Sequence, residues 1–216
     1  MNLLSKLFHF VLLTVKKHNI DESHGLKHSM DILTTANNIY EQEVVKYPFL
    51  KEQEKIIYVS SVVHDMCDKK YMDQNKGIEN INNYITSLKD NNQNHYINKS
   101  ESEIVKKIIS TMSYSYVKKN GFPEMGEYQT AYNIVREADL LSAYDFDRCI
   151  IYQMNQSNST FEESFDDAVS LFEKRMFKHN EDGLFFTDYA KQNYQPLEKH
   201  AKIQINQWKR LIRKNI

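Results

Sequence analysis

Apolar residues recur at every third or fourth position along most of the chain, which is the period of an amphipathic α-helix. In residues 1–19, Lys16 and Lys17 follow the apolar stripe and no small-residue cleavage site comes after them, so the segment lacks the pattern of a signal peptide. The stripe is also too short to cross a bilayer. We therefore predict that residues 1–19 form a helix packed on the core, with a peripheral membrane anchor as the alternative. The stripe consists of Leu3, Leu4, Leu7, Phe8, Val11, Leu12 and Val15.

The same period predicts seven further helices, and polar connections separate them. Ser100 and Glu103 have the spacing of a capping box that opens the fourth of these helices. Glycine (5) and proline (3) are scarce, which argues against many tight turns. No linker or internal repeat interrupts the pattern, so we predict an all-α protein with a single domain over residues 1–216: the first helix at 1–19, core motifs at 20–145 and C-terminal helices at 160–214. The predicted helices cover residues 21–40, 52–66, 78–88, 100–112, 127–143, 161–178 and 187–213.

The charge balance argues against a nucleic-acid partner. The chain has 28 basic and 29 acidic residues and a pI near 6.7, so it lacks the excess of positive charge that binds phosphate backbones. Its two cysteines, Cys67 and Cys149, form neither a CxxC pair nor a disulfide framework. Reduced thiols of this kind predict a cytoplasmic location.

His64 and Asp65 stand at the end of the most apolar of these segments, residues 52–66. Adjacent residues on a helix point about 100° apart, so both side chains can reach one point only if it lies just beyond the helix end. A buried carboxylate without a partner is costly. A divalent ion accepts this mixture of imidazole nitrogen and carboxylate oxygen. The pair therefore predicts a metal site, provided that other segments supply further ligands.

Three residues elsewhere are candidates to complete such a site. His24 and His28 are four positions apart and share a helix face with apolar neighbours. Asp139 lies on a stripe that is otherwise apolar or small. From the residues alone, ordinary hydrogen-bonded histidines and a paired core acid remain open as alternatives to metal ligands.

In this order, His28, His64–Asp65 and Asp139 resemble the H…HD…D signature of the HD-domain metal-dependent phosphohydrolases, which are all-helical. The chain is also similar to one bacterial subgroup of that family over roughly residues 20–212. The similar segments are D-x-S-H-x-x-x-H at 21–28, HDxxDxKF/Y at 64–71, I-I-x-x-x-S-Y/F-S at 108–115, xADxL at 137–141, F-x-x-K-L at 172–176 and T-x-x-A at 187–190.

The resemblance implies a single HD domain that binds one divalent metal ion. The ion implied is manganese, with Mg²⁺, Co²⁺, Ni²⁺ and Fe²⁺ as alternatives, and Asp68 occupies the place where two-metal relatives carry a further histidine. The implied ligands are His28, His64, Asp65 and Asp139.

The resemblance also implies a substrate, namely a small phosphorylated molecule of the nucleotide class. Subgroup members resemble nucleoside triphosphate pyrophosphohydrolases, which release a monophosphate and pyrophosphate, and 5′-nucleotidase and phosphodiesterase activities remain open. Asp68 is placed to hold the attacking water or to donate a proton. Lys69 or Lys70 would bind phosphate oxygens, with a solvated helix end as the alternative. His24 would orient His28 or contact phosphate.

Two positions depart from the subgroup pattern. Asp31 stands where a basic residue is usual, three positions after the first metal histidine, and Ser142 stands where xADxL often continues to a second acid. These departures support a second hypothesis, a non-catalytic HD relative that binds a nucleotide or a partner. A third is a helical interaction protein whose His and Asp residues are core pairs. Aromatic residues that could stack a base include Tyr71, Tyr114 and Tyr116.

Overall fold

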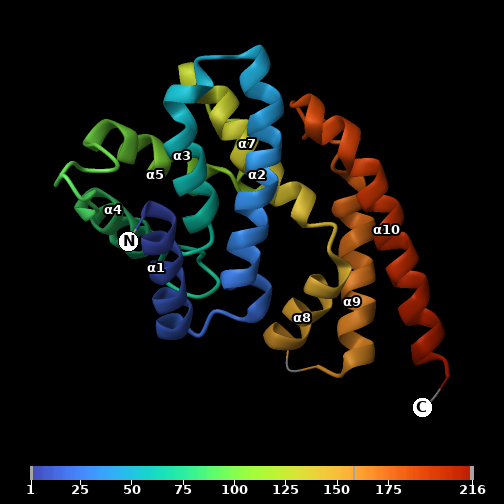
Figure 1. Cartoon of the computed structure of the whole chain (residues 1–216). Coiled ribbons are helices and arrows are strands. Elements are labelled where there is room, and N and C mark those ends of the chain that lie inside the picture. The colour runs from blue at the N-terminus through green and yellow to red at the C-terminus, as the bar shows by residue number, and fades with distance from the viewer. Residues whose placement is uncertain (1, 158, 215–216) are drawn as a thin grey trace.

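Every segment with the helical period contains a helix in the computed structural model, which describes residues 2–157 and 159–214. These residues form ten α-helices and three short 3₁₀ helices without a β-strand, so the predicted all-α class is confirmed (Figure 1). The α-helices are α1 (Leu3–His18), α2 (Leu26–Lys46), α3 (Leu50–Val63), α4 (Gln74–Ser87), α5 (Lys99–Thr111), α6 (Tyr114–Asn120), α7 (Gln129–Ser142), α8 (Phe146–Ser157), α9 (Phe161–Lys174) and α10 (Asp188–Ile212).

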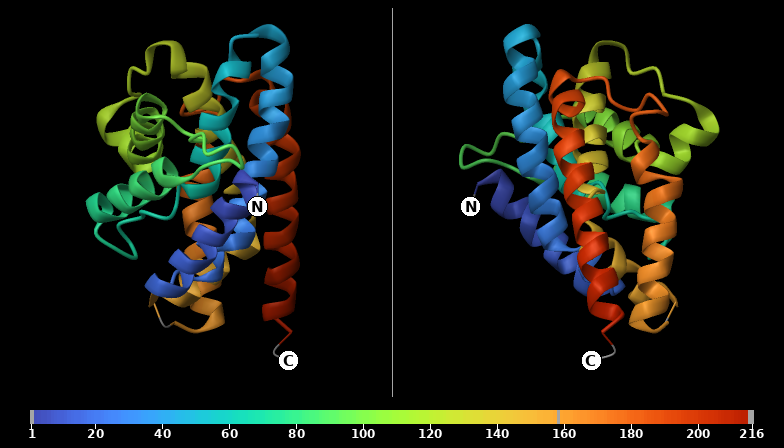
Figure 2. Two further views of the ribbon diagram at one scale, coloured as in Figure 1. Left: turned by 60° about the vertical axis from the view of Figure 1, so that its left-hand side comes forward. Right: turned by 90° about the vertical axis from the view of Figure 1, so that its right-hand side faces the viewer.

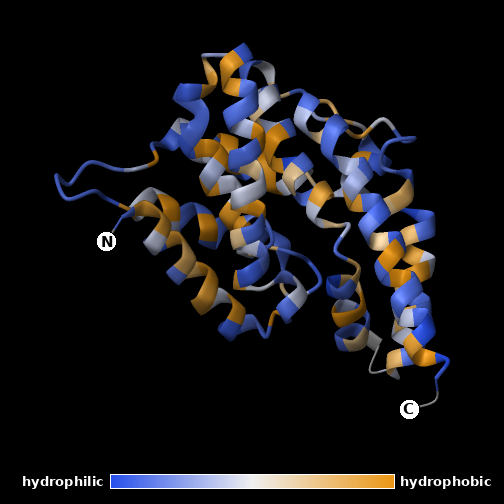
Figure 3. Ribbon diagram, turned by 45° about the vertical axis from the view of Figure 1, so that its right-hand side comes forward, coloured by the Kyte–Doolittle hydropathy of each residue, from blue (hydrophilic) through white to orange (hydrophobic). Residues whose placement is uncertain are grey.

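Helices α2, α3 and α7 form the centre of the fold. Each of the three packs on the other two, and α3 also packs on α5. Their facing positions carry small or branched side chains, of which Ala36, Val62 and Ala138 have no exposed surface. Helices α8 and α9 pack together on one side, and α10 runs along α2, α7 and α8 (Figures 1 and 2). Hydrophobic and hydrophilic residues are interspersed along the helices, as expected for amphipathic helices that bury one face (Figure 3).

The N-terminal helix packs on the core as predicted. Leu7 and Val11 of α1 have no exposed surface, and α1 contacts α2 and α3. Asn2 caps the first turn by accepting a hydrogen bond of 2.9 Å from the Ser5 amide, and Asn19 ends the helix in a left-handed conformation (φ 50°). Within the described residues, no helix has the length and apolar character needed to cross a membrane.

The capping box of α5 lies two residues before the predicted one. The Asn98 side chain accepts a hydrogen bond from the Glu101 amide (2.9 Å), and the Glu101 carboxylate accepts one from the Asn98 amide (2.8 Å). Ser100 was predicted as the cap, but it lies inside the first turn and donates its hydroxyl hydrogen bond to Asn98. Asn98 is the cap because its backbone is extended (ψ 175°) whereas residue 100 is already helical.

Helix α2 begins five residues after the predicted start at Asp21. Asp21 instead caps a 3₁₀ turn, Glu22–His24, and its carboxylate accepts hydrogen bonds from the amide and the hydroxyl of Ser23. Local bonding of this kind competes with a regular helix. His24 therefore lies on the turn before α2 and not on the same helix as His28, although the two ring centroids are 6.1 Å apart.

Two helices and one helix break were not predicted. Helix α6 follows its cap Ser113, which accepts a hydrogen bond from the Tyr116 amide (3.2 Å), and α8 occupies a segment for which no helix was predicted. The predicted helix 161–178 is split, because Arg175 (φ −131°, ψ −65°) turns the chain from α9 into the 3₁₀ turn Met176–Lys178. Both features matter for the site, since α8 carries Arg148 and the break carries Arg175.

A glycine on α4 sets the position of the turn that follows α3. Gly77 packs against this turn, and a Cβ at position 77 would lie 2.8 Å from both Cα and Cβ of Cys67. Only glycine allows this approach. The turn that contains His64 and Asp65 is thereby held against α4.

We expect Gly77→Ala to lower the free energy of unfolding by about 1–3 kcal/mol, because the added methyl group forces α4 away from Cys67. Urea denaturation measures the change. The exposed position Asn83 on the same helix provides the control, and Asn83→Ala should stay within about 0.5 kcal/mol of the wild type. An unchanged midpoint for Gly77→Ala would mean that α4 does not hold the turn.

Candidate metal centre

His64 and Asp65 follow the last residue of α3 and bring their side chains to one point. His64 Nε2 lies 3.1 Å from Asp65 Oδ2, although neighbouring residues within a helix would diverge. The chain leaves the helix at His64 and enters a turn, which permits this convergence. His64 Nδ1 lies 2.9 Å from the Ser61 carbonyl oxygen, which can only accept a hydrogen bond. The Nδ1 proton is therefore directed to Ser61, and Nε2 faces Asp65.

His28 reaches the same point from the first turn of α2. Its side chain is buried, and its Nε2 lies 3.2 Å from His64 Nε2 and 3.1 Å from Asp65 Oδ2. Since α2 packs along α3, a residue one turn into α2 meets the residue just beyond the end of α3. His28 thus presents its ring nitrogen to the same position as His64 and Asp65, although it lies 36 residues before His64 in the sequence.

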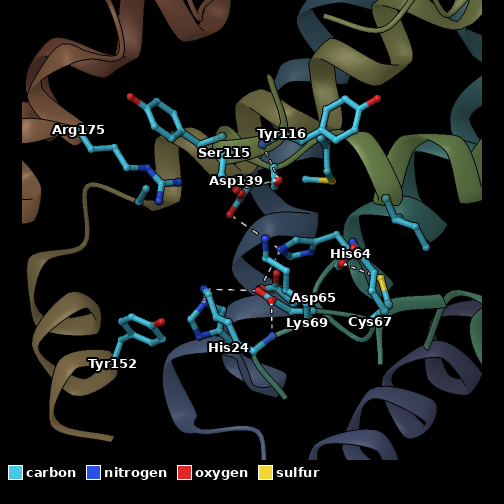
Figure 4. Close-up of a pocket in the computed structure, with 18 of the residues that line it drawn as sticks. His24, His64, Asp65, Cys67, Lys69, Ser115, Tyr116, Asp139, Tyr152 and Arg175 are labelled. Atoms are coloured by element: carbon cyan, nitrogen blue, oxygen red, sulfur yellow. Dashed lines mark hydrogen bonds and ion pairs between the residues drawn. The ribbon is translucent and has the colours of Figure 1, made fainter. Parts of the chain in front are cut away.

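Asp139 adds a second carboxylate from the last turn of α7. Its Oδ1 lies 3.7 Å from His28 Nε2 and 3.9 Å from His64 Nε2. The four residues expected from the sequence to be ligands therefore converge from α2, the end of α3 and α7. Figure 4 shows His64, Asp65 and Asp139 directed toward the same region of a cavity.

The spacing of these atoms suits a metal ion. Two ligand atoms about 2.1 Å from one ion lie roughly 3.0 Å apart at a right angle and 3.4 Å apart at the tetrahedral angle. The contacts among His28, His64 and Asp65 are 3.1–3.2 Å, within this range, and those to Asp139 are slightly longer. Asp65 Oδ2 is buried and accepts no well-formed hydrogen bond from the described residues. His28, His64 and Asp65 could therefore hold a divalent ion, with Asp139 beside them.

The protonation states show how strongly these groups interact. Burial alone would lower the pKa of His64, but Asp65 and Asp139 raise it to about 9. Although burial acts in the opposite direction, the neighbouring histidines hold the pKa of Asp65 well below its usual range, and His64 lowers that of Asp139. Burial, assisted by Arg148, lowers the pKa of His28 to about 4. The two carboxylates therefore favour a positive charge at this position, which either a proton on His64 or a metal ion would supply.

Arg148 of α8 contacts His28 in a way that would oppose metal binding there. Its Nη1 is in close contact with His28 Nδ1 and lies 3.1 Å from His28 Nε2. A guanidinium group can only donate hydrogen bonds, so Nδ1 accepts in this arrangement. An imidazole that binds an ion through Nε2 carries its proton on Nδ1. Metal binding through His28 therefore requires the Arg148 contact to open.

His24 belongs to a hydrogen-bonded network beside the cluster formed by His28, His64, Asp65 and Asp139. Its Nδ1 lies 2.6 Å from the Ser23 hydroxyl and 3.1 Å from the Tyr71 hydroxyl, and Tyr71 donates to Asp21 (2.5 Å). On the other side of the ring, Nε2 lies 3.3 Å from the ammonium group of Lys70. The network fixes the orientation of the His24 ring. The Tyr71 hydroxyl is fully engaged here and does not line the cavity, so the predicted role of Tyr71 in base stacking receives no support.

A cavity of about 480 Å³ opens beside the cluster, between the end of α3, α7, α8 and the start of α6. This volume lies within the range of small-molecule sites. Asp68 and Lys69, two of the predicted catalytic residues, both line the cavity. Asp68 Oδ1 accepts a hydrogen bond from the Lys70 amide (2.9 Å), and its Oδ2 lies 3.4 Å from the Lys70 ammonium group. Lys70 thus contacts both Asp68 and His24, whereas Lys69 lines the wall beside them (Figure 4).

Sequence reasoning missed three cavity residues, Arg148, Arg175 and Tyr152. Arg148 and Tyr152 lie on α8, one of the two helices that were not predicted, and Arg175 lies at the unpredicted break after α9. One signal was present in the sequence. Only five of the 28 basic residues are arginines, and Arg136, Arg148 and Arg175 are the three that precede the C-terminal helix.

The two departures from the subgroup pattern leave the ligand cluster intact. The Asp31 carboxylate pairs with the Lys27 ammonium group (2.5 Å) at an exposed position on α2. The Ser142 hydroxyl donates to the Asp139 carbonyl (2.8 Å) and accepts from Arg148 (3.3 Å). Asp31 is thus neutralised locally, and Ser142 positions Arg148 beside His28.

Comparison with known proteins gives the fold and no function. No family model and no curated protein matches the chain. The crystal structure of a Lactobacillus plantarum protein, solved as a structural genomics target, is similar, with a TM-score of 0.68 and 16% sequence identity. The match covers 98% of this chain and 97% of that chain. At this identity the likeness shows a shared fold alone.

We expect the protein to bind one divalent ion per chain, measured by Mn²⁺ titration and elemental analysis. Removal of any ligand should weaken binding by about 100-fold or more, since loss of an outer hydrogen-bond partner alone costs about 10- to 100-fold. The control Asp31→Asn, which removes an exposed carboxylate near the cluster, should bind normally. Normal binding in any of the ligand variants would remove that residue from the site. The variants are His28→Ala, His64→Ala, Asp65→Asn and Asp139→Asn.

We expect Arg148→Gln to raise the affinity for Mn²⁺ by about tenfold, because it removes a positive charge and supplies an oxygen that can accept the His28 Nδ1 proton. Arg148→Lys keeps the charge and should show little gain. The measurement is competitive titration against a fluorescent chelator. Weaker binding in Arg148→Gln would mean that the arginine supports the ion.

Proposed function

We propose that the protein is a metal-dependent phosphohydrolase of the HD-domain type that acts on a nucleotide or a related small phosphoester. The proposed reaction is hydrolysis of a nucleoside triphosphate to the monophosphate and pyrophosphate. The main support is the convergence of His28, His64, Asp65 and Asp139. Three of them, His64, Asp65 and Asp139, line a cavity that is large enough for such a ligand. The resemblance of the ordered motifs to the HD family adds to this support.

A bound divalent ion would supply water with a lowered pKa and would polarise a phosphoryl oxygen. The chain's part is to hold that ion with two imidazoles and two carboxylates. The Ser61 carbonyl keeps the His64 proton on Nδ1, so that Nε2 is available. Manganese, magnesium, cobalt, nickel and iron(II) all accept this mixture of nitrogen and oxygen ligands.

The remaining cavity residues provide proton transfer and charge neutralisation. The water oxygen adds to the α-phosphorus, the bond from that phosphorus to the bridging oxygen breaks, and pyrophosphate leaves with the bonding electrons. In this proposal the Asp68 carboxylate accepts a proton from the attacking water. Lys69 and Lys70 bind phosphate oxygens, and His24 orients Lys70 through the 3.3 Å contact. Positioning and charge neutralisation account for most of catalysis in phosphoryl transfer.

The charge of the cavity also fits a phosphorylated ligand. Five basic side chains and four aspartates line it, and Asp65 and Asp139 are two of those aspartates. A divalent ion would offset these two, which leaves the basic side chains in excess by three. A polyanion is the ligand that such a cavity attracts. The two cysteines are free and buried, which agrees with the proposed cytoplasmic location.

We expect the purified protein to release pyrophosphate from at least one nucleoside triphosphate with Mn²⁺ present and not with excess chelator. Asp65→Asn should lower kcat/KM by about 1,000-fold or more, since it removes a ligand atom of the ion. Asp31→Asn is the matched control and should retain activity.

A chromatographic screen of mono-, di- and triphosphates together with cyclic and diester substrates identifies the reaction. Phosphate release from monophosphates alone would indicate a 5′-nucleotidase, and cleavage of diesters alone a phosphodiesterase. A metal-loaded protein that turns over none of these substrates would overturn the proposed function, and thermal stabilisation by a nucleotide without turnover would then indicate a binding protein.

A further inference from the structure

Arg175 is a cationic side chain in the cavity wall for which the cluster and the proposed proton transfer give no role. It lies at the break after α9, and its guanidinium group points toward Asp139 (Figure 4). In the view of Figure 4, Arg175 and Asp139 lie in the upper part, and His24 and Lys69 lie in the lower part. The cavity thus has cationic groups on two sides of the ligand cluster.

The position of Arg175 is fixed by an aromatic ring. Its guanidinium carbon lies 4.3 Å from the centroid of Tyr114, and Tyr114 is itself held because its hydroxyl donates to Asp182 (3.3 Å) and accepts from Lys118 (3.1 Å). Stacking on an aromatic face leaves the edge of a guanidinium group free to donate hydrogen bonds. Arg175 is therefore oriented in advance of any ligand.

The charge of Arg175 lacks a partner in the described part of the chain. No carboxylate oxygen there lies within 4 Å of its nitrogens, and Arg175 Nε is buried without a hydrogen-bond acceptor. Asp139 is the carboxylate that interacts with it most strongly. A divalent ion at the cluster would offset the charge of Asp139, so the guanidinium group would then be left without a counter-charge.

The surroundings of Arg175 increase the positive potential. Arg136 is almost fully buried, with Nε and Nη2 unpartnered, and only its Nη1 donates, to the Leu184 carbonyl (3.0 Å). His179 is fully buried with both ring nitrogens unpartnered, and burial together with the two arginines lowers its pKa to about 3. A neutral His179 adds no charge to that of the two guanidinium groups, and Asp139 is a carboxylate that interacts with both of them. Such an arrangement is costly unless a ligand brings negative charge.

We propose that Arg175, held on Tyr114, binds a phosphate group of the substrate other than the one attacked by water. The cavity would then select polyphosphate esters, of the nucleoside di- and triphosphate class, over monophosphates. The inference rests on the proposed function, which places the phosphate attacked by water at the ion held by the cluster. A guanidinium fork donates two parallel hydrogen bonds to phosphate oxygens, which a lysine cannot match.

Binding of inorganic pyrophosphate and of orthophosphate to the Mn²⁺-loaded protein tests this inference without turnover. By isothermal titration, the wild type should bind pyrophosphate about tenfold or more tightly than orthophosphate. Arg175→Gln should weaken pyrophosphate binding by about 10- to 100-fold and orthophosphate binding by less than about threefold, because it removes charged hydrogen bonds to the second phosphate. Arg175→Lys should restore part of the preference. Lys174→Gln, which changes the exposed preceding residue, is the matched control and should behave as the wild type.

Two further measurements make the outcome decisive. Elemental analysis must show that Arg175→Gln keeps its ion. If that variant does not fold, Tyr114→Leu removes the supporting ring and should also reduce the pyrophosphate preference. An unchanged ratio of pyrophosphate to orthophosphate affinity in a folded, metal-loaded Arg175 variant would overturn the inference.

The result separates the inference from the proposed function. Hydrolysis of triphosphates with unchanged KM and kcat in Arg175→Gln would retain the function and overturn the inference. Arg175-dependent pyrophosphate binding by a protein that hydrolyses no phosphoester would retain the anion site and overturn the function.

Discussion

Two partly buried carboxylates and two buried imidazoles meet at one point in this protein, and their electrostatics constrain how the central helices are arranged. Removing the charges of Asp65 and Asp139 from water costs free energy. The two carboxylates raise the pKa of His64, and a proton on His64 would offset part of that cost when no ion is present. Since the ligands come from α2, the end of α3 and α7, none of these helices can shift without separating them. The same three helices bury the central apolar side chains, so hydrophobic packing holds the charged groups together.

Residues outside the cluster hold its side chains in position, and most of these contacts involve backbone atoms. The Ser61 carbonyl sets the tautomer of His64, and Gly77 lets α4 approach the turn that contains Asp65. Glu137, two positions before Asp139, connects α7 to the start of α10. Its carboxylate accepts hydrogen bonds from the Phe186 and Thr187 amides and from the Thr187 hydroxyl. His64, Asp65 and Asp139 therefore lie on segments that another element holds in position.

The cavity differs from the cluster in having positive charge without matching negative charge. Lys70 is shared between Asp68 and His24. Arg175 is instead stacked on Tyr114 and forms no ion pair within 4 Å with a carboxylate of the described residues. Arg148 lies between the two regions and contacts both His28 and Ser142. Loading of the ion and binding of an anionic ligand would change the environment of the same arginines, so the two events are expected to be coupled.

The apolar period predicted the all-α class and most of the helices, since burial of one helix face imposes a pattern every 3.6 residues. The resemblance of the residue order to the HD-domain signature also pointed to His28, His64, Asp65 and Asp139, whereas the residue types alone left hydrogen-bonded core histidines and a paired core acid open. The sequence could not show that Asn98, not Ser100, caps α5, since both have the required spacing and the backbone conformation decides between them. It also gave no indication that Arg148 and Arg175 line the cavity: one lies on a short helix without a long apolar stripe, the other at a break, and only the packing of α8 and α9 places them beside the cluster.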